Sequence, residues 1–361
     1  MQEIRFDKIF TGSEWIRDKS IVIEDGRIAK IAPGNGEGVK NGFLCAGFID
    51  LQLYGGGGKL FSNQATTDCI TSTFEEHIKT GTVAFQITLN CSPKNTMSQA
   101  IQACKNYQGK GLVGLHLEGP FFNPVRRGAH QEAFVQKPDM AFIESLISET
   151  NGLPTYLTIA PEMFESAVLN RLIESPIMVS IGHSEASFEQ ANAAINQGIS
   201  RITHLFNAMS QWQSRALGIV GTSFSSDAWT SIIVDGLHCD FESVKLAKKL
   251  KGDRLFLITD AVTNDVSGPY FFSQTDGRFT NDAGTLSGSS LTMQEAVQNC
   301  VEKANISLEE AIRMATIYPA QVANLDQDLG SIEVGKRACF IHFSDDLAIQ
   351  QVWYDGEPCI N

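Results

Sequence analysis

Short apolar segments alternate with longer segments of helical periodicity through the middle of the chain. The apolar segments number eight: GFIDLQL (47–53), VAFQITL (83–89), LVGLHLEGP (112–120), TYLTIAPE (155–162), IMVSIGHS (177–184), RITHLFNAM (201–209), TSIIVDGLH (230–238) and RLFLITDA (254–261). Candidate helices between them cover, for example, residues 65–79, 94–107, 139–149, 161–174, 185–197 and 240–250, and two more follow near 292–303 and 307–317. Strands that alternate with helices pair in parallel, and eight of them predict a closed (β/α)8 TIM barrel of the α/β class.

The two ends of the chain share a different pattern. Residues 1–46 alternate apolar and polar positions, which is typical of short antiparallel strands joined by tight turns such as Asp25–Gly26. The tail returns to this pattern, with a turn expected at Asp355–Gly356. We therefore predict a small β-sandwich-like domain formed by residues 1–46 and 330–361, and a barrel domain over residues 47–329.

Composition and charge narrow the class of protein. Hydrophobic residues make up 43% of the 361 residues and charged residues 19%, as in ordinary globular proteins. The net charge of −13 disfavours a nucleic-acid partner, since a phosphate backbone would be repelled. No apolar run approaches the roughly 20 residues that span a membrane, and the first residues lack a secretory signal pattern. The eight cysteines form no Cys-x-x-Cys pair and look like reduced thiols, so we expect a cytoplasmic protein without a membrane partner.

Polar side chains follow the apolar segments at the points where strands should end. They are Gln52, His116, Glu118, Glu162, His183, His204, Asp235, His238 and Asp260. In a (β/α)8 barrel the carboxyl ends of the strands converge on one mouth, where active sites lie. We therefore expect side chains that are far apart in sequence to share one pocket.

Three of these strand ends suit a metal ion. Glu118, His183 and His204 offer one carboxylate and two imidazoles, which suit zinc or a similar divalent ion with one coordination place left for water. A lone histidine at such a place is more often a hydrogen-bonded core residue, but three aligned strand ends favour the metal site. Asp260 ends the eighth segment and could take a proton from a water molecule, although an aspartate after a strand is also a common turn residue.

Other residues suit an anionic ligand. Asn207, Arg215 and His238, with free backbone N–H groups, could seat a phosphate, although Arg215 could equally be a solvated loop residue. His130 lies in a long loop rich in glycine, proline and arginine that could arch over the mouth. The segment GTLSGSSLTM (284–293) could offer N–H groups to a ligand, but a helix cap at Ser290 or Thr292 explains it as simply.

Taken together, these segments resemble the N-acetylglucosamine-6-phosphate deacetylases of the amidohydrolase superfamily. The resemblance rests on GFIDLQLYGG, GLHLEGPFFNP with GAH, IAPE, SIGHSEA, THLFNAM, DGLH, LITDA, GTLSGSSLTM and MATIYPA, and it extends over about residues 20–340. It implies a metal-dependent barrel of the amidohydrolase type with a small β domain built from both termini. It also implies hydrolysis of the acetamide of a phosphorylated amino sugar, N-acetyl-D-glucosamine 6-phosphate, to D-glucosamine 6-phosphate and acetate.

The resemblance assigns a role to each candidate residue. The metal ligands would be Glu118, His183 and His204, which would hold one divalent ion, Zn²⁺ in the first place, with Fe²⁺, Co²⁺, Mn²⁺ or Ni²⁺ as alternatives. Asp260 would be the general acid and base, and His130 would polarise the acetyl carbonyl. The substrate-binding residues would be Gln52, Ala129, His130, Asn207, Ala208, Arg215, His238, Leu286, Ser287 and Gly288. Because family members complete the phosphate seat across a subunit interface, here assigned to Arg215 and His238, a homodimer is implied.

One departure from the superfamily concerns the first strand. Gln52 and Tyr54 stand where many amidohydrolases carry the His-x-His pair that ligates one of two metals. Amide and phenol oxygens are poor ligands, so we predict a single metal with Gln52 lining the site, and Tyr54 receives no role. Three alternatives stay open: the galactosamine epimer as substrate, another cyclic amidohydrolase such as a dihydroorotase-like enzyme, and an inactive barrel that acts as a binding protein.

Overall fold

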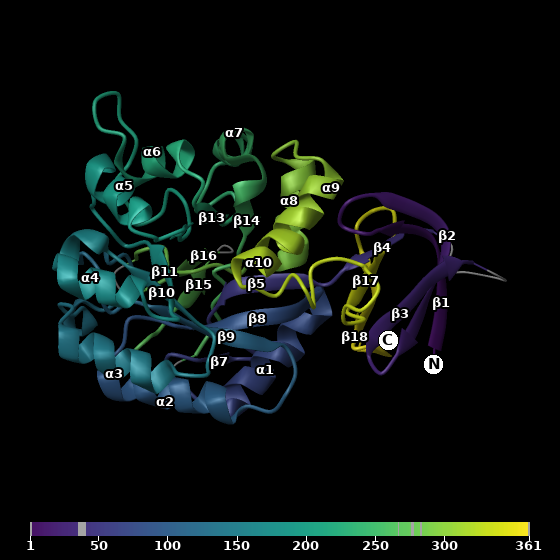
Figure 1. Ribbon diagram of the computed structural model, residues 1–361, viewed down its shortest axis with the longest axis horizontal. Helices are drawn as coiled ribbons and strands as arrows, with labels where there is room; N and C mark the ends of the chain where they lie inside the picture. The colour runs from purple at the N-terminus through teal and green to yellow at the C-terminus, as the bar shows by residue number, and fades with distance from the viewer. Residues whose placement is uncertain (1, 35–40, 266, 276–277, 282–283, 360–361) are drawn as a thin grey trace.

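A parallel barrel forms the larger part of the molecule (Figure 1). The computed structural model describes residues 2–34, 41–265, 267–275, 278–281 and 284–359. Within these ranges, eight strands pair in sequence order in one sheet: β5 (Phe48–Leu53), β8 (Thr82–Leu89), β9 (Leu112–Glu118), β10 (Thr155–Ile159), β11 (Met178–Ile181), β12 (Arg201–Ile202), β13 (Trp229–Ile232) and β14 (Leu255–Leu257). All neighbouring pairs are parallel, so the predicted (β/α)8 barrel is confirmed.

The barrel closes between its first and last strands near the mouth. The N–H group of Tyr54 donates to the carbonyl of Ala261, and the N–H group of Asp260 donates to the carbonyl of Gln52, both at 3.0 Å. Below them the buried carboxylate of Asp50 accepts a hydrogen bond of 2.5 Å from the Thr259 hydroxyl. This closure places the end of the eighth strand directly beside the end of the first.

Helices cover the outside of the barrel (Figure 1). They are α1 (Thr67–His77), α2 (Lys94–Asn106), α3 (Met140–Thr150), α4 (Ser166–Ile173), α5 (Phe188–Asn196), α6 (Gly218–Ser225), α7 (Phe241–Lys251), α8 (Met293–Glu302), α9 (Leu308–Ala315) and α10 (Ile317–Val322). Polar residues in the sequence mark where several of these helices begin, because a side chain must accept hydrogen bonds from the free N–H groups of the first turn. Thr292 and Glu295 form a capping box at the start of α8, so Thr292, rather than Ser290, is its N-cap.

A second sheet joins the two termini, whose purple and yellow strands lie side by side in Figure 1. In the described part of the termini it contains β1 (Gln2–Phe10), β2 (Trp15–Glu24), β3 (Arg27–Pro33), β4 (Phe43–Ala46), β17 (Phe340–Phe343), β18 (Ile349–Tyr354) and β19 (Glu357–Pro358), in the order β19-β18-β17-β4-β1-β2-β3. A bridge between Arg27 and Arg337 brings the β3 edge back towards the C-terminal segment, and the curled sheet encloses its own apolar core.

The separate terminal domain is therefore confirmed, and β4 and β5 belong to different sheets. The boundaries at residues 46/47 and 329/330 stay a prediction, and their outer ends, residues 1 and 361, lie outside the described residues. Across the described part of the chain, the helices are too short or too polar to cross a membrane.

Two short hairpins stand at the mouth of the barrel. They are β6 (Gly55–Gly56) with β7 (Lys59–Leu60), and β15 (Ser273–Thr275) with β16 (Arg278–Thr280). One apolar cluster packs them together, and it consists of Tyr54, Leu60, Val262, Tyr270, Phe272 and Phe279. This cluster forms one wall around the strand ends that carry the polar residues.

Candidate active site

A cavity of about 320 Å³ opens at the carboxyl ends of the barrel strands. Most of the residues predicted for the site line it: Glu118, Ala129, His130, His183, His204, Asn207, Ala208, His238, Asp260, Leu286, Ser287 and Gly288. Gln52 lies behind this lining and contacts it through hydrogen bonds. Arg215 is exposed on the loop before α6 and is not part of the lining. The fold thus brings together side chains from strands that are widely separated in sequence.

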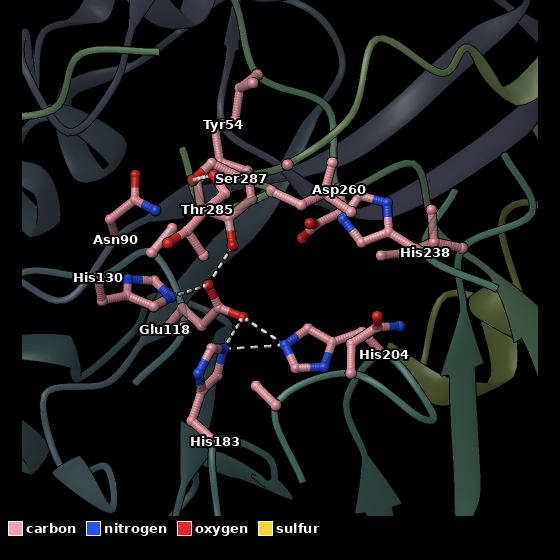
Figure 2. A pocket seen from close by; sticks show the side chains of 18 of the residues that line it. Tyr54, Asn90, Glu118, His130, His183, His204, His238, Asp260, Thr285 and Ser287 are labelled. Atoms are coloured by element: carbon pink, nitrogen blue, oxygen red, sulfur yellow. Dashed lines mark hydrogen bonds and ion pairs between the residues drawn. The ribbon is translucent and has the colours of Figure 1, made fainter. Parts of the chain in front are cut away.

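Glu118, His183 and His204 converge on one point of the cavity (Figure 2). Glu118 Oε1 lies 3.3 Å from His183 Nε2 and 3.1 Å from His204 Nε2, and the two nitrogens are 3.0 Å apart. All three side chains are buried. Three such donor atoms at these distances suit a shared cation, because imidazole nitrogens and carboxylate oxygens are the usual ligands of divalent metals.

The backbone turns sharply where these residues follow their strands. His183, His204 and Asp260 have left-handed conformations, with φ of 50°, 39° and 55°. Such a conformation costs about 1–3 kcal/mol for a residue other than glycine, and it is common at functional sites. The surrounding barrel therefore holds these three side chains in an otherwise unfavourable position.

Hydrogen bonds fix the tautomers of two histidines. His183 Nδ1 lies 2.8 Å from the carbonyl oxygen of Arg126, which can only accept, so Nδ1 carries the proton and Nε2 offers its lone pair to the cavity. His130 is the reverse case. The backbone N–H of Cys91 donates to its Nδ1 at 3.2 Å, so the neutral ring carries its proton on Nε2, 3.0 Å from Glu118 Oε2.

Glu118, His130 and His183 also lie close enough to form a three-ligand cluster of their own. We favour His204 as the third ligand because its Nε2 faces Glu118 Oε1 together with His183, whereas His130 presents an N–H group to the other oxygen. His204 Nδ1 is buried and has no hydrogen-bond partner among the described residues, so the hydrogen-bond partners of this ring all lie on its Nε2 side.

Burial and the mutual charges of the site shift its protonation. Burial lowers the pKa of His183 to about 4. Burial alone would raise the pKa of Glu118, but the charges of His130 and His183 hold it well below its ordinary value. Burial alone would lower the pKa of His204, but its hydrogen bond to Glu118 outweighs burial and raises the pKa. The shifts of Glu118 and His183 therefore favour an ionised carboxylate and a neutral imidazole, the forms that bind a metal ion, whereas the shift of His204 favours its protonated form, whose proton a metal ion would displace.

Asp260 stands beside this cluster. Burial first, and then the charge of Glu118, raise the pKa of Asp260 to about 7. The Nε2 group of Gln52 lies 2.6 Å from Asp260 Oδ1 and 2.9 Å from Glu118 Oε1, so one amide bridges the two carboxylates. A carboxyl group with a pKa near neutrality can both accept and return a proton, which is the property that general acid–base catalysis needs.

His238 lies on another wall of the cavity (Figure 2). Its Nδ1 donates to Asp235 Oδ2 at 2.6 Å, and its backbone N–H donates to Oδ1 of the same carboxylate. The assignment of His238 to a neighbouring subunit is therefore corrected, because this side chain lines the cavity of its own chain.

Residues 43–359 match the amidohydrolase family, which covers the barrel and part of the terminal domain. The chain belongs to the amidohydrolase family. Together with the buried cluster of histidines and a glutamate, this membership indicates a divalent-metal site.

Relatives of this amidohydrolase are similar over nearly their whole length. The chain is 34% identical to N-acetylglucosamine-6-phosphate deacetylase of Haemophilus influenzae, over 94% of each chain. It is also 34% identical to N-acetylgalactosamine-6-phosphate deacetylase of a Shewanella species, over 88% of this chain and 83% of the relative. The crystal structure of N-acetylglucosamine-6-phosphate deacetylase from Pasteurella multocida superposes with a TM-score of 0.93 at 33% identity, covering all of both chains.

The strand-end pattern did not identify every residue of the cavity. Asn90 directly follows β8 and lines the cavity, so the same positional rule could have found it. Tyr54, to which the sequence pattern assigns no role, also lines the cavity, with its hydroxyl directed at Glu118 (Figure 2). Phe272 and Val262 belong to the apolar wall, and no sequence signal distinguishes them from ordinary core residues.

Proposed function

We propose that this amidohydrolase cleaves the acetamide of N-acetyl-D-glucosamine 6-phosphate to D-glucosamine 6-phosphate and acetate, in amino-sugar catabolism. The observation that carries the proposal is the convergence of one carboxylate oxygen and two imidazole nitrogens, beside Asp260, in a cavity at the barrel mouth. Similarity to deacetylases of phosphorylated hexosamines supports the substrate class. The galactosamine epimer is the alternative, because a relative of equal identity is named for that substrate.

We propose one divalent ion per subunit, held by Glu118, His183 and His204. The three donor atoms lie 3.0–3.3 Å apart, close to the roughly 3.3–3.6 Å between ligands of a tetrahedral zinc ion. Zn²⁺ is the first choice, and Fe²⁺, Co²⁺, Mn²⁺ and Ni²⁺ suit the same donors. When bound, the ion would lower the pKa of a water molecule and polarise the acetyl carbonyl.

The chain itself supplies the proton transfers. Asp260 accepts a proton as water attacks the acetyl carbon and then delivers it to the departing amine nitrogen. His130 donates a hydrogen bond from its Nε2–H group to the carbonyl oxygen as negative charge develops there, and one such contact is worth roughly 3–4 kcal/mol. The fixed tautomer of His130 supports this role, because its proton lies on Nε2, the nitrogen that faces Glu118 Oε2 in the cavity lining.

The remaining lining would hold the sugar and its phosphate. Asn207, Ala208 and His238 would bind the phosphate, and Ala129 and the segment 286–288 would contact the sugar. The predicted substrate contact of Gln52 is corrected, because this residue lies behind the lining and contacts Glu118 and Asp260 instead. Arg215 is exposed and does not line the cavity of its own chain. This position supports the proposal that Arg215 reaches the phosphate site of a partner subunit in a homodimer. Binding of the remote phosphate would hold the amide near the attacking water.

We also propose that the enzyme works in the cytoplasm. All eight cysteines are free thiols, and seven of them are buried. Such thiols are typical of proteins from reducing compartments.

Acetate release from the two epimeric N-acetylhexosamine 6-phosphates tests the proposed function. We expect the metal-loaded protein to hydrolyse the glucosamine epimer with the higher kcat/KM. Asp260→Asn should bind as much metal as the wild type and lose about 10²–10⁴-fold in kcat, because general acid–base catalysis typically contributes that much. Preference for the galactosamine epimer would favour the alternative, and an undiminished Asp260→Asn variant would remove this residue from the reaction.

A further inference from the structure

Tyr54 is a buried phenol at the edge of the site that the proposed reaction does not use. It follows β5 directly and is 3% exposed. Its ring belongs to the apolar cluster that also holds Leu60, Val262 and Tyr270. The ring is thus held on a packed wall, with its hydroxyl directed at Glu118 (Figure 2).

The two oxygens of Glu118 face different partners. Oε1 faces the Nε2 atoms of His183 and His204, which is the side where the metal would bind. Oε2 accepts hydrogen bonds from the Tyr54 hydroxyl and from His130 Nε2. A carboxylate oxygen has about two lone-pair sites, so two donors occupy Oε2.

The partner of Oε2 changes during the proposed reaction. His130 must turn its N–H group to the substrate carbonyl, and it then no longer donates to Glu118. Tyr54 is the remaining donor to Oε2 among the described residues. A phenol is protonated at neutral pH and has one hydrogen to give. The Tyr54 hydroxyl also lies 2.9 Å from Gln52 Nε2, whose two hydrogens are shared between this hydroxyl and the carboxylates of Glu118 and Asp260.

We propose that Tyr54 is a positioning residue for the metal site, which holds Glu118 Oε2 so that Oε1 alone binds the ion. This inference rests on the proposed metal-dependent function and adds a residue to it. Without the hydroxyl, Glu118 could rotate and offer both oxygens to the ion, which would change the coordination number. The role differs from simple core packing, because it acts through one oxygen of one ligand.

Tyr54→Phe tests the role, since it keeps the ring and removes the hydroxyl. The matched control is Tyr270→Phe, which removes another buried hydroxyl of the same cluster, bonded at 2.5 Å to the Cys91 carbonyl. We expect Tyr54→Phe to weaken Zn²⁺ binding about 10–100-fold in competition with a chromophoric chelator, as is typical when a residue that orients a ligand is lost. The visible spectrum of the Co²⁺-loaded variant should also differ from that of the wild type in band position and intensity.

The control should keep both the Zn²⁺ affinity and the Co²⁺ spectrum of the wild type, with a thermal midpoint of the metal-free protein similar to that of Tyr54→Phe. Wild-type affinity and spectrum in Tyr54→Phe would overturn the inference. Equal losses in both variants would also overturn it, because they would indicate general packing. A wild-type protein that binds no Zn²⁺ would instead contradict the proposed function itself.

Discussion

At the scale of the single residue, main-chain contacts decide what each imidazole can do. His183 gives its Nδ1 proton to a backbone carbonyl and keeps a lone pair for the cavity, whereas His130 receives a backbone N–H and keeps a proton for it. One histidine is therefore suited to bind a cation and the other to donate to an oxyanion. Residue type alone does not distinguish these roles, because the contacts that set them come from Arg126 and Cys91 in neighbouring loops.

Asp50 gives a pH-dependent prediction at the same scale. Burial raises its pKa from 3.8 to about 6, although hydrogen bonds from Thr259 and Gln52 oppose the shift. The folded state thus binds this proton more tightly than the unfolded chain, so the contribution of Asp50 to stability is complete below about pH 4 and is lost as the pH rises through 6. Relative to Asp50→Asn, the wild-type free energy of unfolding should fall by about 2.4 kcal/mol from pH 4 to pH 7.

Urea unfolding of both proteins across this pH range, with a chelator present, measures the difference. The difference between the two free energies of unfolding isolates Asp50, because every group that the substitution does not disturb contributes equally to both proteins. Parallel curves for the two proteins would show that Asp50 keeps its ordinary pKa in the folded state.

The site could be predicted from the sequence as far as position along a strand determines it. Glu118, His183, His204 and Asp260 all follow predicted strands, and the structure brings them into one cavity. Tyr54 could not be given a role in this way, because its hydroxyl acts on a glutamate 64 positions away. Such a contact depends on the closure of the barrel, which no local pattern describes.

At the scale of the element, amphipathic periodicity identified most helices. The exceptions are α6 and α10, which no predicted range covers. In α6, residues 218–223 are all buried, so the helix has no long polar face to reveal its period. The sixth apolar segment was expected to be one strand, yet β12 contains only Arg201–Ile202. The chain leaves the strand at His204, where the left-handed backbone directs the imidazole into the cavity.

At the scale of the whole molecule, the two termini form a sheet of their own and leave the barrel mouth free. The terminal sheet pairs β4 with both β1 and β17, so the first and last parts of the chain depend on each other. The similar alternation of apolar and polar residues at both ends was sufficient to predict this pairing. The number of subunits has no such local signal, and here it rests on the position of Arg215.

Mixed dimers test whether Arg215 serves a partner subunit. The Asp260→Asn and Arg215→Ala variants should each be impaired when expressed alone. In a mixed dimer, the chain that carries Arg215→Ala keeps its own Asp260 and receives Arg215 from the Asp260→Asn chain, so one of the two sites is complete. Random pairing makes half of the dimers mixed, so coexpression should restore about a quarter of the wild-type kcat/KM. Acetate release by the coexpressed pair measures the recovery.

The matched control replaces Arg215→Ala with His238→Ala. His238 lines the cavity of its own chain, so this second pair should show no recovery. Failure of the first pair, with both variants folded and dimeric, would contradict a phosphate site shared across the interface.

Anomalous diffraction from crystals of the zinc-loaded protein, recorded above and below the zinc absorption edge, would locate the metal ion. We expect one anomalous peak per chain, at an ion bound by Glu118 Oε1 and the Nε2 atoms of His183 and His204. An ion held by His130 in place of His204, a second ion beside Gln52 and Tyr54, or no ion at this point would contradict this expectation.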